Sequence, residues 1–323
     1  MGKQKEYSVI IRCFNEEKHI ARLLSGILEQ TLRPKEIIVV DSGSTDATLS
    51  IVSHFPVKVL KISKEEFSFG RSLNIGCETA TSQFLIIASG HVYPVYKDWA
   101  EQLLKPFDDE KVGLVYGKQR GSDSSFYSER RLLMKWFPEV SQNGQKHPFC
   151  NNANAAIRRR IWEEIKYNEE LTGLEDLEWA KNITQKGYKI VYESKAEVIH
   201  VHNESYSQIF HRYYREAMAL KRIYPEERFS RKEFVRLLIS NIYSDSVAAL
   251  KEKKFCRNIK DIIMFRLLQF LGTYRGFRSG NIEMNLLKDR FYYPSEKSNN
   301  HKSATDSDRL KIRYSEIIHK TDK

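Results

Sequence analysis

Short runs of β-branched and other apolar residues alternate with helical patterns through the first two hundred residues, and this alternation limits the possible folds most. The expected strands cover residues 8–11, 36–40, 57–62, 84–88, 112–117 and 189–192. Helical spacing or capping residues predict helices over residues 20–28, 47–53, 71–79 and 175–186, and one that starts near Arg159. Such an α/β chain is expected to form a parallel sheet with helices on both faces.

Polar residues follow three of these strands. Arg12, Asp41 and Ser89 each stand where an apolar run ends. Ligands of open α/β sheets bind at the carboxyl ends of the strands. We therefore expect the three loops that begin at these residues to share one rim of the sheet.

The sequence pattern and composition of the chain change after His202. Residues 206–278 are helical in pattern, basic and aromatic, and the polar residues after Tyr293 are expected to form a mobile tail. We therefore divide the chain into an α/β domain over 1–205, a basic helical subdomain over 206–292 and a disordered tail over 293–323. Residues 206–280 hold sixteen basic and seven acidic residues, within a chain of net charge +11. Such a concentration of positive charge suits a polyanionic partner, either nucleic acid or an anionic membrane surface.

Several classes of protein are excluded by what the sequence lacks. No apolar run approaches the roughly 18 to 20 residues of a membrane span, and the N-terminal run lacks a signal-peptide core, so we expect a cytosolic chain. The four cysteines are far apart and form no CxxC pair, which argues against a disulfide framework or a thiolate zinc site. The first strand leads into RCFNEE, and a glycine-rich dinucleotide turn and a GxxxxGK[ST] loop are both missing.

Two strand ends carry candidate site residues, each with two interpretations. Asp41, followed by SGSTD, either caps the next helix or accepts a hydrogen bond from a nucleotide base or ribose. Ser89, Gly90 and His91 follow FLIIA, where the imidazole could be a structural group or could meet a metal ion or a phosphate.

Two further pairs come later in the chain. Glu175 and Asp176 open a predicted helix, where they either complement the helix dipole or place a carboxylate that can deprotonate a hydroxyl. His200 and His202 are two residues apart, so their side chains face the same way if the strand continues. They could be buried and hydrogen-bonded, or one could bind a metal.

Taken in order, these segments resemble a family 2 glycosyltransferase with the GT-A fold. The resemblance covers about residues 6–205 and rests on SVIIRCFNEEKHI, EIIVVDSGSTDAT, FLIIASGHVYPVYKDW, NNANAAIRR, LTGLEDLEWAKNITQKGYKI and VIHVH. It implies a mostly parallel sheet flanked by helices, followed here by a C-terminal helical segment.

The resemblance also implies roles for individual residues. Asp176 would be the catalytic base, with Glu175 beside it. Nucleotide-sugar contacts are implied for Arg12, Asn15, Glu16, Asp41, Arg71, Asn74, Ser89 and Gly90. Acceptor contacts are implied for Asn152 and Asn154, while Trp179 either stacks on a sugar or belongs to the core. Arg212 and Arg215 either contact the diphosphate or form a solvated basic face.

The metal motif departs from the family pattern. Members usually have Asp-x-Asp where this chain has Ser89, Gly90 and His91, which is similar to a bacterial polysaccharide and rhamnosyltransferase-like branch with Ser-x-His. His91 then takes the metal-ligand position, and His200, with His202 as its neighbour, would supply a second ligand. We expect a weak site for a divalent cation, Mn or Mg, completed by diphosphate oxygens.

The function implied is inverting transfer of a single sugar from a UDP- or dTDP-sugar to a hydroxyl of a saccharide acceptor linked to a polyprenyl diphosphate, in bacterial capsule or O-antigen assembly. The enzyme would be peripheral at the cytoplasmic face of the cell membrane, with no nucleic-acid partner. The helical segment would either only pack on the catalytic domain or also present basic and aromatic residues to anionic lipid. The alternative is a catalytically silent scaffold of the same fold that binds membrane or nucleic acid.

Overall fold

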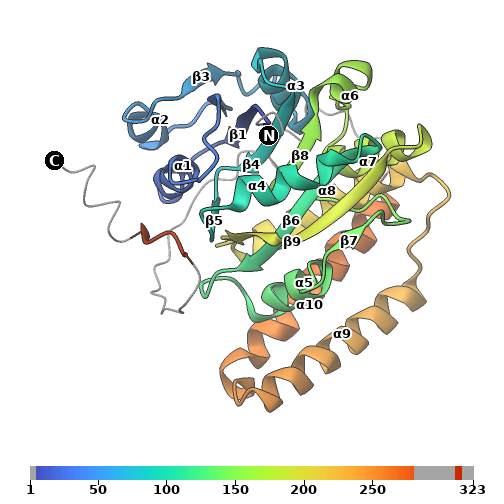
Figure 1. The fold of residues 1–323 in the computed structure, drawn as a ribbon. Helices are drawn as coiled ribbons and strands as arrows, with labels where there is room; N and C mark the ends of the chain where they lie inside the picture. Colours follow the sequence, from blue (N-terminus) through green and yellow to red (C-terminus); the bar gives the residue numbers. More distant parts are fainter. Residues whose placement is uncertain (1–4, 280–309, 315–323) are drawn as a thin grey trace.

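The computed structural model describes residues 5–279 and 310–314. A single mixed sheet forms its centre, and three long helices lie along one side of it (Figure 1). The strands are β1 Tyr7–Cys13, β2 Glu36–Asp41, β3 Lys58–Lys61, β4 Phe84–Ser89, β5 Val92–Pro94, β6 Val112–Gly121, β7 Gln142–Asn143, β8 Asn154–Arg158 and β9 Lys189–His200. Their order is β3-β2-β1-β4-β8-β6-β9-β5, with β7 paired to β9.

Helices cover both faces of this sheet, as the alternation predicts. They are α1 Ile20–Leu28, α2 Thr48–Val52, α3 Phe69–Thr79, α4 Trp99–Leu104, the short 3-10 helix η1 Lys105–Asp108, α5 Tyr127–Trp136, α6 Arg159–Glu164, α7 Glu175–Gln185, α8 Tyr206–Ile223, α9 Arg231–Lys251 and α10 Phe255–Arg278. The first four strands in the order are parallel to one another, whereas β8 is antiparallel to both β4 and β6. The mostly parallel α/β fold is therefore confirmed, with β8 and the short β5 and β7 as reversed strands.

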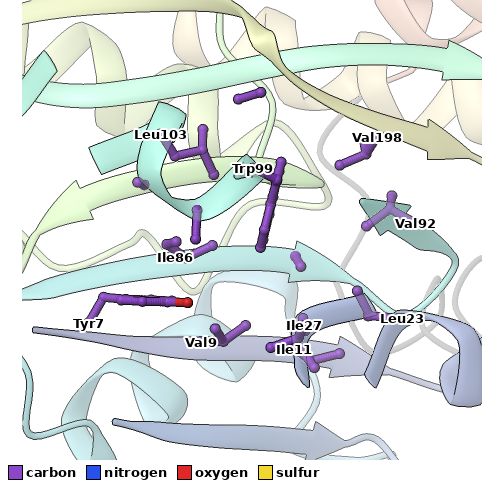
Figure 2. Close-up of a cluster of buried hydrophobic side chains, with 14 of the residues drawn as sticks. Tyr7, Val9, Ile11, Leu23, Ile27, Ile86, Val92, Trp99, Leu103 and Val198 are labelled. Atoms are coloured by element: carbon purple, nitrogen blue, oxygen red, sulfur yellow. The ribbon is translucent and has the colours of Figure 1, made fainter. Parts of the chain in front are cut away.

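Successive residues of β1 enter two different cores. Val9 and Ile11 pack with α1 and α4 on one face, where Trp99 fills the centre (Figure 2). Ile10 packs with α3, α6 and α7 on the other face. All four side chains are fully buried. A strand that is buried on both faces has no polar side to alternate with, which is why its sequence is a continuous apolar run.

The parallel register aligns the ends of the strands that carry polar residues. Arg12 of β1 lies opposite Ser89 of β4, and Cys13 lies opposite Asp41 of β2. The loops after β1, β2 and β4 therefore leave the sheet at one rim, as expected from the sequence.

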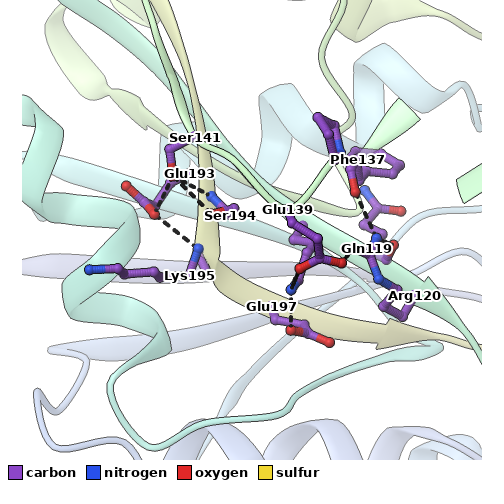
Figure 3. Close-up of polar contacts among 12 residues, drawn as sticks. Gln119, Arg120, Phe137, Glu139, Ser141, Glu193, Ser194, Lys195 and Glu197 are labelled. Carbon is purple, nitrogen blue, oxygen red and sulfur yellow. Dashed lines mark hydrogen bonds and ion pairs between the residues drawn. The ribbon is translucent and has the colours of Figure 1, made fainter. Parts of the chain in front are cut away.

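Strand β9 is longer than its apolar run predicts and reaches this rim at His200. Its pairing with β6 is interrupted between Gly117 and Gln119, and the two strands then continue together to their ends. Figure 3 shows polar contacts along this stretch: Arg120 contacts Glu139, and Ser141 contacts Glu193. Strand β5 then pairs with the end of β9, with Val92 opposite His200. This pairing sets His91, just before β5, beside His200.

The helical pattern over residues 206–278 is confirmed, and the three helices pack on α5. A capping box formed by Ser205 and Gln208 opens α8. Helices α8 and α10 approach closely because Gly272 has no side chain: a Cβ there would lie 2.5 Å from the carbonyl oxygen of Phe210. Helix α9 is joined to both α5 and α10 through the fully buried Asp245.

Two expectations need correction. The sequence pattern predicts no helix between residues 117 and 159, but this segment contains α5, whose Leu132 and Leu133 are buried among α8, α10 and the sheet. The expected tail is wrong for residues 310–314, where Ile312 is buried and Lys311 bridges to Tyr96. The rest of that tail, and the end of the basic subdomain at 280–292, lie outside the described residues.

Three of the four cysteines are buried, whereas Cys256 is exposed. Over the part of the chain that the structure describes, the helices are all too short or too polar to cross a lipid bilayer.

Candidate active site

A pocket opens at the rim where β1, β4 and β9 end. Its wall takes residues from the sheet, from the loop before β8, from the start of α7, and from α5 and α8 of the helical side. Of the residues expected in the site, it is lined by Arg12, Ser89, His91, Asn152, Glu175, Asp176, His200, His202, Arg212 and Arg215. The helical segment is therefore one wall of the pocket.

Three histidines meet on one side of this pocket. The rings of His91 and His200 are stacked with centroids 5.0 Å apart, and the ring of His202 lies 4.0 Å from that of His200. One nitrogen from each ring lies within 4.8 Å of the others. They converge because β5 pairs with the end of β9, and because His202 follows that strand at a spacing of two.

Each of these rings has Nδ1 hydrogen-bonded to an acceptor. Nδ1 lies 2.6 Å from Glu16 Oε1 in His91, 2.7 Å from Gln119 Oε1 in His200, and 2.6 Å from Glu129 Oε1 in His202. An acceptor at Nδ1 requires the proton there, which leaves the lone pair on Nε2. The Nε2 atom of His200 is buried and has no hydrogen-bond partner among the described residues.

Burial and nearby positive groups favour the neutral form of His200, the central ring of the three. Burial lowers the pKa of His200 well below its usual value, and His202, His91 and Arg212 lower it further. Burial acts in the same direction on His91, but the Glu16 carboxylate outweighs it and raises the pKa of His91. Gly90 makes that contact possible, since a Cβ there would come within 2.7 Å of Glu16 Cγ.

These residues fit a divalent cation. Ligating histidines usually donate their second N–H to a carboxylate or carbonyl oxygen, which fixes the tautomer and the orientation of the ring. Here all three rings have such a partner, and the buried Nε2 of His200 is left for a ligand. Glu129 is held by Arg212 as well; burial raises its pKa, but His202 and Arg212 outweigh that effect and lower it to about 2.

Asp176 lines the same pocket, at the start of α7. Its carboxylate accepts hydrogen bonds from the backbone N–H of Asn152 at 3.0 Å and of Leu177 at 2.8 Å. Burial raises the pKa of Asp176 to about 7, and the adjacent Glu175 carboxylate adds to the rise while the two N–H groups oppose it. Leu174, just before the helix, has φ +56, a conformation that bulky residues rarely adopt. This turn presents both acidic residues to the pocket.

Glu175 has a different environment from Asp176. It is buried and paired with Arg12, whose Nη1 lies 2.9 Å from Glu175 Oε1. The guanidinium groups of Arg12 and Arg215 each lie 5.0 Å from the ring centroid of Phe69. Two cations thus flank one aromatic ring at the pocket.

A family model described as "Glycosyl transferase family 2" matches residues 8–166. Residues 8–166 therefore belong to glycosyl transferase family 2. The match ends just after α6. It therefore does not include Asp176, His200 at the end of β9, His202 just after that strand, or α8.

Curated relatives of this chain include two with O-antigen names. O-antigen chain rhamnosyltransferase WbaN of Salmonella anatum is 32% identical over 197 residues, which are 58% of this chain and 62% of that protein. O-antigen chain rhamnosyltransferase RfbN of Salmonella typhimurium is 28% identical over 219 residues, 64% of this chain and 70% of that protein. The chain thus spans less than two thirds of the length of the first.

Solved structures support the same fold. Mannosyltransferase PcManGT from Pyrobaculum calidifontis, in complex with GDP-Man and Mn2+, aligns with a TM-score of 0.58 at 18% identity, covering 85% of this chain and 88% of that one. Residues 1–349 of TarS from Staphylococcus aureus align with a TM-score of 0.50 at 17% identity, covering 84% and 91%. At these identities the likeness concerns the fold.

Two residues expected at the acceptor belong to the core. Trp179 is 1% exposed, and its Nε1 donates to the carbonyl oxygen of Ile165. Asn154 is fully buried, with its amide hydrogen-bonded to the backbone of Lys118 and Ala196. The sugar-contact interpretation of both is therefore wrong.

Asn152, in contrast, lines the pocket, and both polar atoms of its amide have no partner within the described part of the chain. An amide in this position can hydrogen-bond a ligand.

Four residues expected at the nucleotide stabilise loops or the core and do not line the pocket. Asp41 accepts from the N–H groups of Gly43 and Ser44, which is a capping role in the turn after β2. Asn15 accepts from the N–H of Thr45. The remaining two lie at α3: Arg71 pairs with Glu66 and Glu169, and the Asn74 amide bonds Tyr167 and Trp162. Glu16 also lies outside the lining and meets the site through His91.

Sequence reasoning missed three residues that matter to the pocket. Gln119 and Glu129 hold the histidine rings, and Trp136, at the end of α5, lines the pocket with its side chain 41% exposed. Gln119 falls in the strand that pairs with β9, so its contact could have been found only with the register in hand. Glu129 and Trp136 lie in α5, a helix that the sequence pattern does not predict.

Proposed function

We propose that the protein is an inverting glycosyltransferase that moves one sugar from a UDP- or dTDP-sugar to a hydroxyl of a lipid-linked saccharide acceptor, in the assembly of a cell-surface polysaccharide. It would work at the cytoplasmic face of the cell membrane. The two O-antigen rhamnosyltransferases among its relatives make rhamnose the donor sugar to test first.

The observation that carries this proposal is that one pocket holds both a carboxyl group of raised pKa and a histidine cluster. Asp176, with its pKa raised to about 7, lines the same pocket as three histidines with anchored Nδ1 atoms. Inversion requires one base for the acceptor hydroxyl and positive charge near the departing diphosphate. Asp176 and the histidine cluster supply these two needs separately.

Asp176 would accept the proton of the acceptor hydroxyl while that oxygen attacks the anomeric carbon from the face opposite the diphosphate. A pKa near the working pH suits a general base, because the carboxylate is then both available and basic. The N–H groups of Asn152 and Leu177 hold its oxygens in place. Glu175 is paired with Arg12, so its role would be to position that guanidinium.

A divalent cation would be held by His91, His200 and His202, and when bound it would neutralise charge on the leaving diphosphate. Imidazole ligands suit borderline transition metals, whereas Mg prefers oxygen ligands, so Mn is the ion we expect to bind more tightly. The Mn2+ in the structure of the Pyrobaculum mannosyltransferase, which shares this fold, supports that choice. Arg12 and Arg215 would add positive charge beside the diphosphate.

The acceptor would lie between Asn152 and Trp136. The unpartnered amide of Asn152 can exchange hydrogen bonds with sugar hydroxyls, and the exposed indole of Trp136 offers an apolar face for a sugar ring. In this arrangement Trp136 takes the part that the sequence assigned to Trp179. Trp136→Ala should raise KM for the acceptor about tenfold and leave donor binding unchanged.

The direct test measures thermal stabilisation and nucleotide-sugar turnover of the purified protein with a panel of UDP- and dTDP-sugars. Each sugar is tried with Mn, with Mg and with a chelator. We expect one nucleoside diphosphate to raise Tm in the presence of Mn, and His91→Ala to remove that shift. A protein that no nucleotide stabilises under any of these conditions would instead be the silent scaffold.

A further inference from the structure

Helix α9 presents large apolar side chains to solvent. Four of them are half exposed or more: Val235 50%, Ile239 63%, Tyr243 71% and Leu250 57%. Their spacings of four, four and seven residues place them on one side of the helix. Scattered single apolar residues on a surface are ordinary, but an aligned set on one helix marks a contact surface.

The fold itself does not use this side of α9. The adjacent side of the helix already packs: Ala249 is buried with Tyr127 and Ile262, and Ile242 lies against the same cluster. Asp245, on that inner side, is fully buried between Arg131 and Arg266. The helix therefore has an inner face that holds it to α5 and α10, and an outer apolar face that residues 5–279 and 310–314 leave exposed.

Positive charge surrounds the outer face. Residues 228–260, which contain α9 and the turn into α10, have nine lysines and arginines against three acidic residues, one of which is the buried Asp245. All nine basic side chains are exposed: Arg228, Arg231, Lys232, Arg236, Lys251, Lys253, Lys254, Arg257 and Lys260. They cluster at the two ends of α9, so the apolar stripe lies between two basic groups.

We propose that this outer face of α9 docks on a lipid bilayer with anionic headgroups. Apolar side chains between basic ones are what an interfacial helix needs, because the former enter the acyl boundary while the latter meet phosphate groups. A second copy of the chain would bring like charges together across the same surface. A nucleic acid would complement the charge but leave Ile239 and Val235 in water.

The docking face is connected to the pocket through one helix. On α5, Arg131 bonds Asp245 of α9 at 3.0 Å, and two residues earlier Glu129 bonds His202 and Arg212 of the pocket wall. A bilayer bound by α9 would therefore lie at a fixed distance and orientation relative to the pocket. The purpose of this arrangement, though not the binding itself, rests on the proposed function, since a lipid-linked acceptor is met at a bilayer surface.

The test is co-sedimentation of the full chain with vesicles of phosphatidylglycerol and phosphatidylcholine, compared with vesicles of phosphatidylcholine alone. We expect binding to the anionic vesicles that weakens with salt. Arg231→Glu with Lys232→Glu should reduce the partition coefficient about 25-fold or more, at roughly 1 kcal/mol for each lost charge. Ile239→Ser with Tyr243→Ser should reduce it about tenfold without changing the net charge.

Val59→Ser is the matched control, because Val59 is a partly exposed apolar residue on β3, at the other end of the sheet order. It should bind vesicles like the wild type. Equal binding by the α9 variants, equal binding to both kinds of vesicle, or no binding at all would overturn the proposal. So would light scattering that shows a dimer which the Ile239 and Tyr243 changes convert to monomer.

Nucleotide binding measured on the same preparation keeps this result separate from the proposed function. Lost vesicle binding with intact nucleotide binding overturns only the docking surface. Vesicle binding without any nucleotide response overturns only the glycosyltransferase proposal.

Discussion

The two walls of the pocket are supported in different ways. On the sheet side, Arg12 and Ser89 are placed by the ladder between β1 and β4, and backbone N–H groups hold Asp176. On the helical side, charged side chains hold one another, as in the network of Glu129, Arg212 and Glu204. Backbone ladders tolerate changes of side chain, whereas a buried charge network depends on every member. Mutations in the two walls should therefore have different effects on activity and on stability.

The largest effect is expected at the base. Asp176→Asn should lower kcat about a thousandfold, because the amide cannot accept the hydroxyl proton, while donor affinity stays close to that of the wild type. Steady-state kinetics with separate measurement of nucleotide binding checks this. Glu178→Gln, on the same helix but outside the pocket lining, is the control and should retain most activity. Substantial turnover by the Asp176 variant would remove the base from the mechanism.

The next effect belongs to the helical side and is one of stability. Asp245→Asn leaves the fully buried Arg266 without its counter-charge and should lower the free energy of unfolding by about 3 to 5 kcal/mol. Urea unfolding measures this, with the exposed Lys232→Ala as the control. Mn affinity of the folded variant should stay within about twofold of the wild type. A large loss of affinity would show that the walls do not act independently.

A smaller effect is expected where the sheet side holds the histidines. Gln119→Leu keeps the size of the side chain but removes the acceptor for His200 Nδ1, and should weaken Mn binding about ten- to a hundredfold. Titration calorimetry or the Mn paramagnetic resonance signal gives the affinity without requiring turnover. Tyr192→Phe is a control on the neighbouring strand, since the Tyr192 hydroxyl bonds only the Pro138 carbonyl oxygen among the described residues. Unchanged affinity in Gln119→Leu would contradict the anchoring role.

The smallest effect is that of pH. The base must be deprotonated to act, so with a pKa of about 7 for Asp176, kcat should fall about tenfold per pH unit below 7 and level off above it. Stability should run the other way: a carboxyl whose pKa is raised on folding destabilises the folded state as pH rises from about 4 to 7. The Tm of Asp176→Asn relative to wild type should therefore increase between pH 5 and pH 8. A constant difference would mean that the pKa is not raised.

The sheet side was largely predictable and the helical side was not. The rim formed by Arg12, Asp41 and Ser89 could be expected because parallel strands align their carboxyl ends. The choice between Trp179 and Trp136 could not be made, since both are helical tryptophans and only packing tells which ring is buried. Helix α5 was missed because its charged residues look solvent-exposed in sequence, whereas Glu129 is buried by partners distant along the chain.

Family resemblance helped at the chemical residues and misled at supporting ones. Asp176, His91 and His200 line one pocket. The amides of Asn74 and Asn154 are instead hydrogen-bonded within the core. A motif gives the position of a residue in the chain, but the hydrogen bonds available to its side chain depend on neighbours that one sequence does not identify.

Residues 310–314 pack against β5, and this contact matters for any shortened form of the chain. The hydroxyl of Tyr314 donates to the carbonyl oxygen of Pro94 in β5, and its ring packs against Tyr93 and the guanidinium of Arg22. Strand β5 begins one residue after His91. Trimming the C-terminus to aid crystallisation would remove these contacts from β5, which follows a proposed metal ligand. Loss of activity in a shortened form would therefore not show that the longer chain is inactive.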